Sequence, residues 1–171
     1  MIDFTATHLQ LFGLPQQYGI DLNVLESRYR ELQAKAHPDR FAGEDEAQIR
    51  LAEQWSGRIN EAYRVLKSPF ERGCYLLTLQ GVEPFGQNQP AMPPDFLVQQ
   101  MEWHEQLAEA RRHADQLMQL EQSVERHKKT LLAELSSAVD NSTDQAALIL
   151  RKLKFLFRLE EQVGEALEAL E

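Results

Sequence analysis

Apolar residues along most of the chain recur at intervals of three and four, which is the spacing of one face of an α-helix. In the first half, two such stripes predict two long helices separated by Pro38. The stripes consist of Leu22, Leu25, Tyr29, Leu32 and Ala36, and then of Ala52, Trp55, Ile59, Ala62 and Leu66. Asp21 is placed to cap the first helix, and Pro38 ends it because the residue before a proline disfavours helical backbone angles.

Two shorter helices are expected beside this pair. One covers residues 7–12 and is closed by Gly13 and Pro15. The other begins at Ser68-Pro69-Phe70-Glu71, which combines a capping box with proline at the first helical position, and it stops at Gly81. The first 80 residues therefore predict a helical hairpin with short flanking helices.

The second half predicts three longer helices joined by short turns. The first is expected to run from a cap at Asp95 to about Ala110, and the third to be capped by Ser142 together with Gln145. The stripes of the second and third are Leu117, Leu120, Val124, Leu131, Leu135 and Ala138, and then Ile149, Leu153, Leu156, Val163, Leu167 and Leu170. Such an arrangement suggests an antiparallel bundle. For the chain as a whole we expect an all-α fold without strands.

Proline and glycine gather between the two halves. Four of the seven prolines lie close to Gly81 and Gly86, namely Pro84, Pro90, Pro93 and Pro94. This stretch is typical of a linker or a structured turn. We therefore expect a first domain over 1–80, a linker over 81–94 and a second domain over 95–171.

Composition and charge narrow the class of protein. The 171 residues carry a net charge of −9, with 9 basic and 11 acidic side chains in 1–80 and 9 and 16 in 81–171. An acidic chain of this kind argues against a nucleic-acid binder, and no run of about 20 apolar residues predicts a membrane span. Cys74 is the single cysteine, which excludes a disulfide framework and fits a reducing cytoplasm. The first residues do not resemble a secretory signal.

A search for catalytic and metal-binding motifs is largely negative. The chain has no glycine-rich phosphate loop, no Gly-x-Ser-x-Gly and no His-Glu-x-x-His, and none of its five histidines completes a Glu-x-x-His pair. His127 and Cys74 are better explained by packing than by metal binding or nucleophilic chemistry. We therefore expect no enzyme, no metal site and no cofactor.

The exception is His37-Pro38-Asp39, which directly follows a well-marked helix. Proline forces the chain out of that helix, so both polar side chains lie in a constrained loop. Arg28 and Lys35 fall on one flank of the helix, Arg30 on the other, and Arg40 follows the loop. On spacing alone, a turn with solvated charges is favoured over a functional site.

The context of the tripeptide resembles a J-domain, the module by which J-proteins activate DnaK-type chaperones. The similarity covers residues 8–80 and includes Tyr29-Arg30-Glu31-Leu32 before the loop. After it come Asn60-Glu61-Ala62-Tyr63, Val65-Leu66, Ser68, Arg72 and Tyr75. Two positions depart from the pattern, because Ala36 stands where many J-domains carry an aromatic residue and Glu31 interrupts the basic helix.

The rest of the chain is similar to the bacterial form of HscB, the J-domain co-chaperone of iron–sulfur cluster assembly. The similarity rests on Leu11-Phe12-Gly13-Leu14-Pro15, on Tyr75-Leu76-Leu77, on Arg151-Lys152-Leu153-Lys154-Phe155-Leu156 and on the acidic helical tail. It implies two protein partners, the DnaK-type ATPase HscA and the scaffold protein IscU. The set that would dock on the chaperone is His37, Pro38, Asp39, Arg28, Arg30, Lys35 and Arg40.

The resemblance also implies a scaffold-binding face on the second domain. Leu97, Val98 and Met101 point away from the predicted core face of their helix, beside Glu102, Glu105 and Glu109. Phe155 lies about 110° from the middle of the last helix's stripe. Without the resemblance, a wider buried stripe with a solvated acidic edge explains the first six equally well, and Phe155 is either core edge or contact anchor.

Two other functions stay open at this point. A J-domain co-chaperone serving a different client, such as unfolded chains, fits the first domain equally well. A helical enzyme holding a metal or cofactor is the alternative from another class, and the ligand search disfavours it.

Overall fold

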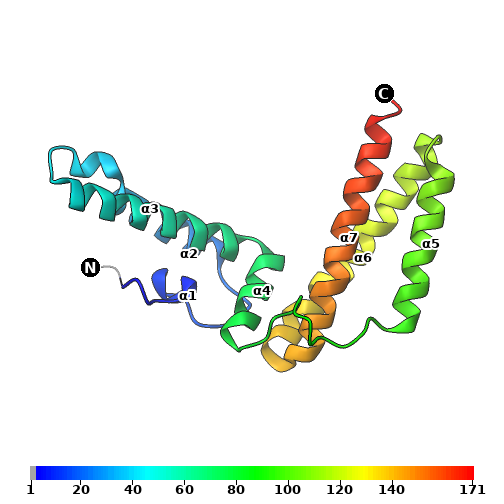
Figure 1. The fold of residues 1–171 in the computed structure, drawn as a ribbon, viewed down its shortest axis with the longest axis horizontal. Coiled ribbons are helices and arrows are strands. Elements are labelled where there is room, and N and C mark those ends of the chain that lie inside the picture. Colours follow the sequence, from blue (N-terminus) through cyan, green and yellow to red (C-terminus); the bar gives the residue numbers. More distant parts are fainter. Residues whose placement is uncertain (1–2) are drawn as a thin grey trace. The chain divides into compact units, whose positions relative to one another are not determined.

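A computed structural model describes residues 3–171, and over these residues every regular element is a helix. The chain divides into two compact units, Met1–Leu76 and Leu77–Glu171. The all-α prediction is therefore confirmed. The two units are described separately below (Figure 1).

The first unit is built on a helical hairpin. Its elements are α1 (His8–Leu11), α2 (Leu22–Ala36), a 3₁₀ turn η1 (Pro38–Phe41), α3 (Glu46–Lys67) and α4 (Pro69–Leu79), the last of which runs on past the unit's boundary. Helices α2 and α3 pack against each other, with the Tyr29 ring stacked on Tyr63 at 4.0 Å and the Tyr29 hydroxyl donating to Asn60 Oδ1 at 2.7 Å. All five stripe positions of α3 are buried, whereas Leu22 of the α2 stripe is exposed.

The ends of these helices follow the local chemistry of the sequence. Asp21 Oδ1 accepts from the backbone N–H of Asn23 at 2.9 Å, and Ser68 Oγ accepts from Glu71 N–H at 3.3 Å. Gly81, just after α4, has φ +79°, a conformation that glycine adopts without strain. The predicted capping signals of α2 and α4 are thus confirmed.

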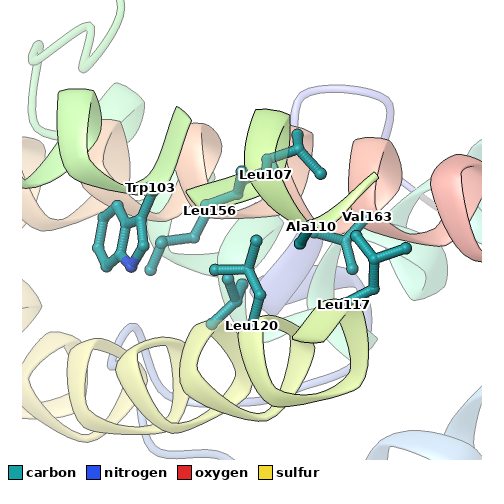
Figure 2. Close-up of a cluster of buried hydrophobic side chains, with 9 residues drawn as sticks. Trp103, Leu107, Ala110, Leu117, Leu120, Leu156 and Val163 are labelled. Carbon is teal, nitrogen blue, oxygen red and sulfur yellow. The ribbon is translucent and has the colours of Figure 1, made fainter. Parts of the chain in front are cut away.

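The second unit is an antiparallel three-helix bundle of α5 (Pro94–Ala110), α6 (Ala114–Asn141) and α7 (Thr143–Glu168). Figure 2 shows how side chains from all three helices meet in one core. That core contains Trp103, Leu107, Ala110, Leu117, Leu120, Val124, Leu156, Leu159 and Val163. Burying this much apolar surface is the dominant favourable term holding the three helices together.

Two details of the second unit differ from expectation. Helix α5 begins at Pro94, so Asp95 lies inside the first turn instead of capping it, and its carboxylate accepts only from the next residue's N–H, that of Phe96. Proline at the first helical position has no N–H and so needs no acceptor there, which explains the earlier start. Leu170 lies beyond the end of α7 and is exposed, because the helix stops at Glu168.

The segment between α4 and α5 contains no helix, and it is held against α7. Arg151 Nη1 donates to the carbonyl oxygen of Pro90 at 2.6 Å, and the Lys154 ammonium lies 4.3 Å from the centre of the Phe85 ring. These contacts belong to the second unit. The domain limits expected from the sequence, 1–80 and 95–171 with a linker between them, stay a prediction.

Candidate functional site

The tripeptide lies at the C-terminal end of α2 and opens η1. His37 has extended backbone angles, and its Nδ1 accepts from the N–H of Asp39 at 3.2 Å. Accepting at Nδ1 leaves the proton of a neutral ring on Nε2. The Asp39 carboxylate lies 3.5 Å from the same nitrogen, and the two side chains are 55% and 91% exposed. The loop therefore fixes its own backbone and presents an N–H donor and a carboxylate to solvent.

The four basic residues around the loop differ in the contacts that their side chains make. Lys35 is exposed and takes part in none of the ion pairs of the described residues. Arg30 pairs with Glu26 at 2.6 Å, and Arg40 Nη1 donates to the carbonyl oxygen of Ala34 at 3.1 Å. Arg28 donates to the carbonyl oxygens of Phe12 and Gly13, so it joins α2 to the turn after α1. Of the four, Lys35 has the side chain most available to a partner.

The flanks predicted for these basic residues agree with the structure. Arg28 and Lys35 line one shallow hollow, and Arg30 lines another. Glu31 borders both hollows, so its carboxylate lies between Arg30 on one flank and Arg28 with Lys35 on the other.

The apolar side chains on the outer face of α5 are well exposed. Leu97, Val98 and Met101 are 46%, 55% and 63% exposed, while Trp103 and Leu107 on the inner face are buried. The reading of this helix as two-faced is confirmed, and that of one wider buried stripe is wrong. The neighbouring glutamates, Glu102, Glu105 and Glu109, are all exposed as well. An exposed apolar patch rimmed by acids has the composition of a protein contact surface.

Phe155 of α7 is partly buried against α5. Its ring stacks on Trp103 at 5.9 Å and meets the ring of Phe96 edge-on at 5.9 Å. The ring of His104 lies across it at 5.6 Å and is exposed. Phe155 is thus an edge of the core that continues toward the surface.

His104 is a member of this surface that the sequence analysis missed. It lies three positions after Met101 and seven after Leu97, which places it on the same side of α5. That spacing would have found it. His104 thus joins the outer face of α5 to the ring of Phe155.

Residues 3–171 contain neither a metal-binding cluster nor a helix that could span a membrane. No three His, Cys, Asp or Glu side chains gather there closely enough to hold a metal ion. Over the same residues, every helix is too short or too polar to cross a bilayer.

Comparisons with known proteins support one family. Residues 92–164 match the family model described as the HSCB C-terminal oligomerisation domain. The chain is 42% identical to the co-chaperone protein HscB homolog of Burkholderia multivorans over all of this chain and 99% of that protein. Among solved structures it resembles the chaperone HscB from Vibrio cholerae (36% identity, TM-score 0.83, 97% of this chain and all of that one). It also resembles human co-chaperone HscB (31% identity, TM-score 0.87, 95% and 83% of the two chains).

Proposed function

The chain belongs to the HscB family of co-chaperones, and we propose that it stimulates the ATPase of HscA, a DnaK-type chaperone, and delivers the scaffold protein IscU to it. In this role the chain catalyses no step itself. It binds one conformational state of the chaperone better than another and so shifts the chaperone's equilibrium toward hydrolysis and tight client binding.

The observation that carries the first half of the proposal is the geometry of His37-Pro38-Asp39. The His37 ring is occupied at Nδ1 by the loop's own backbone, which leaves Nε2 free to meet a partner. Asp39 is almost fully exposed and offers a carboxylate to a donor on the chaperone. A loop that is already rigid loses little conformational entropy on docking. Lys35 and its basic neighbours supply attraction toward an acidic surface and speed the encounter.

The test of this half is an HscA ATPase assay with the full-length protein. His37→Gln is expected to abolish the stimulation while leaving the helical circular dichroism unchanged. The matched control is His113→Gln, the same substitution at an exposed histidine of the second unit, which should stimulate normally. Undiminished stimulation by the His37 variant would show that the tripeptide plays no part.

The second half of the proposal rests on the face of α5 formed by Leu97, Val98, Met101, Glu102, Glu105 and Glu109, together with Phe155. Leu97 and Met101 are 46% and 63% exposed, and the ring of His104, on the same side of α5, lies across Phe155. A partner that covers these side chains removes them from water, and the surrounding glutamates select a partner with basic groups. We assign this face to IscU.

The scaffold contact is tested by titrating IscU into full-length variants. Alanine at both Leu97 and Met101 is expected to weaken binding by roughly 30-fold, since losing buried anchors typically costs about 2 kcal/mol or more. Alanine at Phe155 should add to this loss, but its packing on Trp103 requires a stability check. Met118→Ala with Leu170→Ala is the matched control, because both residues are exposed apolar side chains of the same unit. Unchanged affinity of the Leu97 and Met101 variant would reject this face.

A J-domain co-chaperone with a different client is the alternative. Offering the full-length protein either folded IscU or a permanently unfolded model protein distinguishes this alternative from the proposed function. The proposal requires saturable binding of folded IscU, and binding of only the unfolded chain contradicts it.

A further inference from the structure

A groove on the second unit is lined by none of the residues assigned to the chaperone or to IscU. It has a volume of about 510 Å³ and is lined by residues of α5, α6 and α7. Its apolar walls include Phe96, Trp103 and Leu131, and its polar groups include Arg126, His127 and Lys152. This volume is within the range of sites that hold a ligand or a few side chains of a partner.

The charge of this groove is opposite to that of the unit that carries it. Residues 81–171 have 16 acidic and 9 basic side chains, yet the groove gathers Arg126, Lys152 and His127 against one carboxylate, that of Asp95. Asp95 accepts from the N–H of Phe96 at the end of the groove. A local reversal of sign within an acidic unit favours an anionic partner.

The two permanent cations of the groove are available for binding. Among the ion pairs of the described residues, none includes Arg126 or Lys152. The Lys152 ammonium lies 5.2 Å from the centre of the Phe96 ring, which holds it at the groove's apolar wall. Two other basic residues of the unit are engaged within the fold, Lys128 with two glutamates and Arg151 with the carbonyl oxygen of Pro90.

Apolar and polar features meet in the floor of the groove. His127 Nδ1 is 2.8 Å from the carbonyl oxygen of Ser123, so this nitrogen carries a proton and Nε2 is left for another contact. The His127 ring is perpendicular to the indole of Trp103, with 5.0 Å between ring centres. An anionic group bound by Lys152 and Arg126 would therefore lie next to aromatic surface that an apolar neighbour could cover.

Leu97 and Met101 lie on the side of α5 opposite the groove, although Glu102 and Phe155 of the face assigned to IscU contact Gln99 and Trp103 of its lining. With about 100° per residue, Asp95, Gln99 and Trp103 centre roughly 180° from the middle of Leu97 and Met101. A ligand in the groove therefore leaves Leu97 and Met101 uncovered.

We propose that this groove binds a short acidic segment of a partner protein, with an aromatic or leucine side chain among its carboxylates. The carboxylates meet Arg126 and Lys152, and the apolar side chain covers Phe96 and the exposed edge of the groove near Trp103. The groove is open to solvent, which suits an extended segment of chain that stays partly exposed.

The charge and shape of the groove favour such a segment over other anions. Nucleic acids require a broad basic surface, and here two permanent cations stand in an acidic unit. A membrane presents a flat surface, whereas these cations lie at a concave site between helices. An isolated phosphate or glutamate would leave the apolar walls uncovered.

The test uses full-length protein and a fluorescein-labelled peptide of sequence Asp-Glu-Leu-Phe-Glu-Asp, capped at both ends. Anisotropy is expected to rise saturably, and salt should weaken the binding because charged groups carry part of it. In a Trp55→Phe protein, where Trp103 is the one remaining tryptophan, the same peptide should change the indole emission. The amide peptide Asn-Gln-Leu-Phe-Gln-Asn should bind at least about tenfold more weakly.

Charge-reversal variants locate the peptide. Lys152→Glu and Arg126→Glu are each expected to weaken binding about tenfold or more, since each loses a charge-assisted contact and gains repulsion. Arg112→Glu makes the same charge change after the far end of α5, beyond the lining residues, and should bind the peptide normally. The Leu97 and Met101 alanine variant should also bind it normally, whatever becomes of its affinity for IscU.

Four results would overturn the proposal. They are no saturation up to about 1 mM peptide, equal losses in the Arg112 variant, loss of binding in the Leu97 and Met101 variant, and full displacement by inorganic phosphate, DNA or anionic lipid vesicles at matched charge. The last result would mean attraction to negative charge in general.

Discussion

At the scale of single residues, Arg28 and Lys35 illustrate how two similar side chains serve different ends. Both are basic and lie on the same flank of α2. Arg28 Nη1 donates to the carbonyl oxygen of Gly13 at 2.6 Å and to that of Phe12. Gly13 turns the chain with φ +60°, and a Cβ there would lie 2.8 Å from the same nitrogen. Arg28 is thus part of the fold, whereas Lys35 is exposed.

This difference predicts effects of different size on the free energy of unfolding. Arg28→Ala should lower the free energy of unfolding by about 1–2 kcal/mol, because two backbone carbonyls lose a charged donor. Lys35→Ala should change it by less than about 0.5 kcal/mol. Urea unfolding in a Trp103→Phe background, where Trp55 is the one remaining tryptophan, measures both. Equal stabilities of the two variants would contradict the prediction. Chaperone stimulation by the Arg28 variant must be measured at temperatures where that variant is fully folded.

At the scale of elements, the second unit depends on the pairing of α6 with α7. Lys128 is 12% exposed and lies 2.9 Å from Glu125 on its own helix and 2.7 Å from Glu160 on α7. Burial by itself lowers the pKa of Lys128, but the hydrogen bonds to Glu160 and Glu125 outweigh it and raise the pKa above the usual 10.5. The same hydrogen bond from Lys128 lowers the pKa of Glu125 below 4.5.

The pKa shifts of Lys128 and Glu125 set the pH range over which their ion pair contributes to stability. A lowered carboxyl pKa gives stability that is present above pH 4.5 and is lost as the pH falls through the folded-state value. A raised lysine pKa gives stability that is present below pH 10.5 and is lost as the pH rises through the folded-state value. Between these limits the pair contributes fully.

Lys128→Met is therefore expected to be less stable than the wild type by about 1 kcal/mol near neutral pH, a modest figure because both glutamates are partly exposed to solvent. Methionine fills the partly buried site without adding a polar group. The difference should shrink below pH 4.5 and above pH 10.5, as measured by chemical unfolding across the pH range. A difference that stays constant at all pH values would mean that packing, and not the ion pairs, explains the effect.

At the scale of the whole molecule, the chain combines two units with separate cores and different charge. Each contains one of the two tryptophans, Trp55 in the first and Trp103 in the second. The first is nearly neutral with an exposed tripeptide loop, and the second is acidic with a basic groove and an apolar patch. The total charge of −9 hides this division.

The two tryptophans allow the units to be followed separately in the full chain. Leu156→Ala removes a fully buried side chain of the second core and should destabilise that unit by about 2–5 kcal/mol. In a Trp55→Phe background the Trp103 transition should move to lower denaturant. In a Trp103→Phe background, compared with and without Leu156→Ala, the Trp55 transition should keep its midpoint. A Trp55 transition that shifts equally would mean that the two units unfold as one.

The sequence by itself determined the helices and most of their ends, because capping side chains, prolines and apolar spacing act within a few residues. Asp21, Ser68 and Ser142 cap the helices expected of them. It failed at Asp95, where a proline at the first helical position competed with a capping side chain.

Only the tertiary structure decided which side chains remain available to partners. Arg28 meets carbonyl groups 15 and 16 residues away, His104 lies across Phe155, and Lys152 joins Arg126 at one groove. Such contacts depend on how whole helices pack, and no local spacing specifies them. The sequence therefore determined the helices and the tripeptide loop. The packing of the helices decided which charged side chains form contacts within the fold and which face solvent.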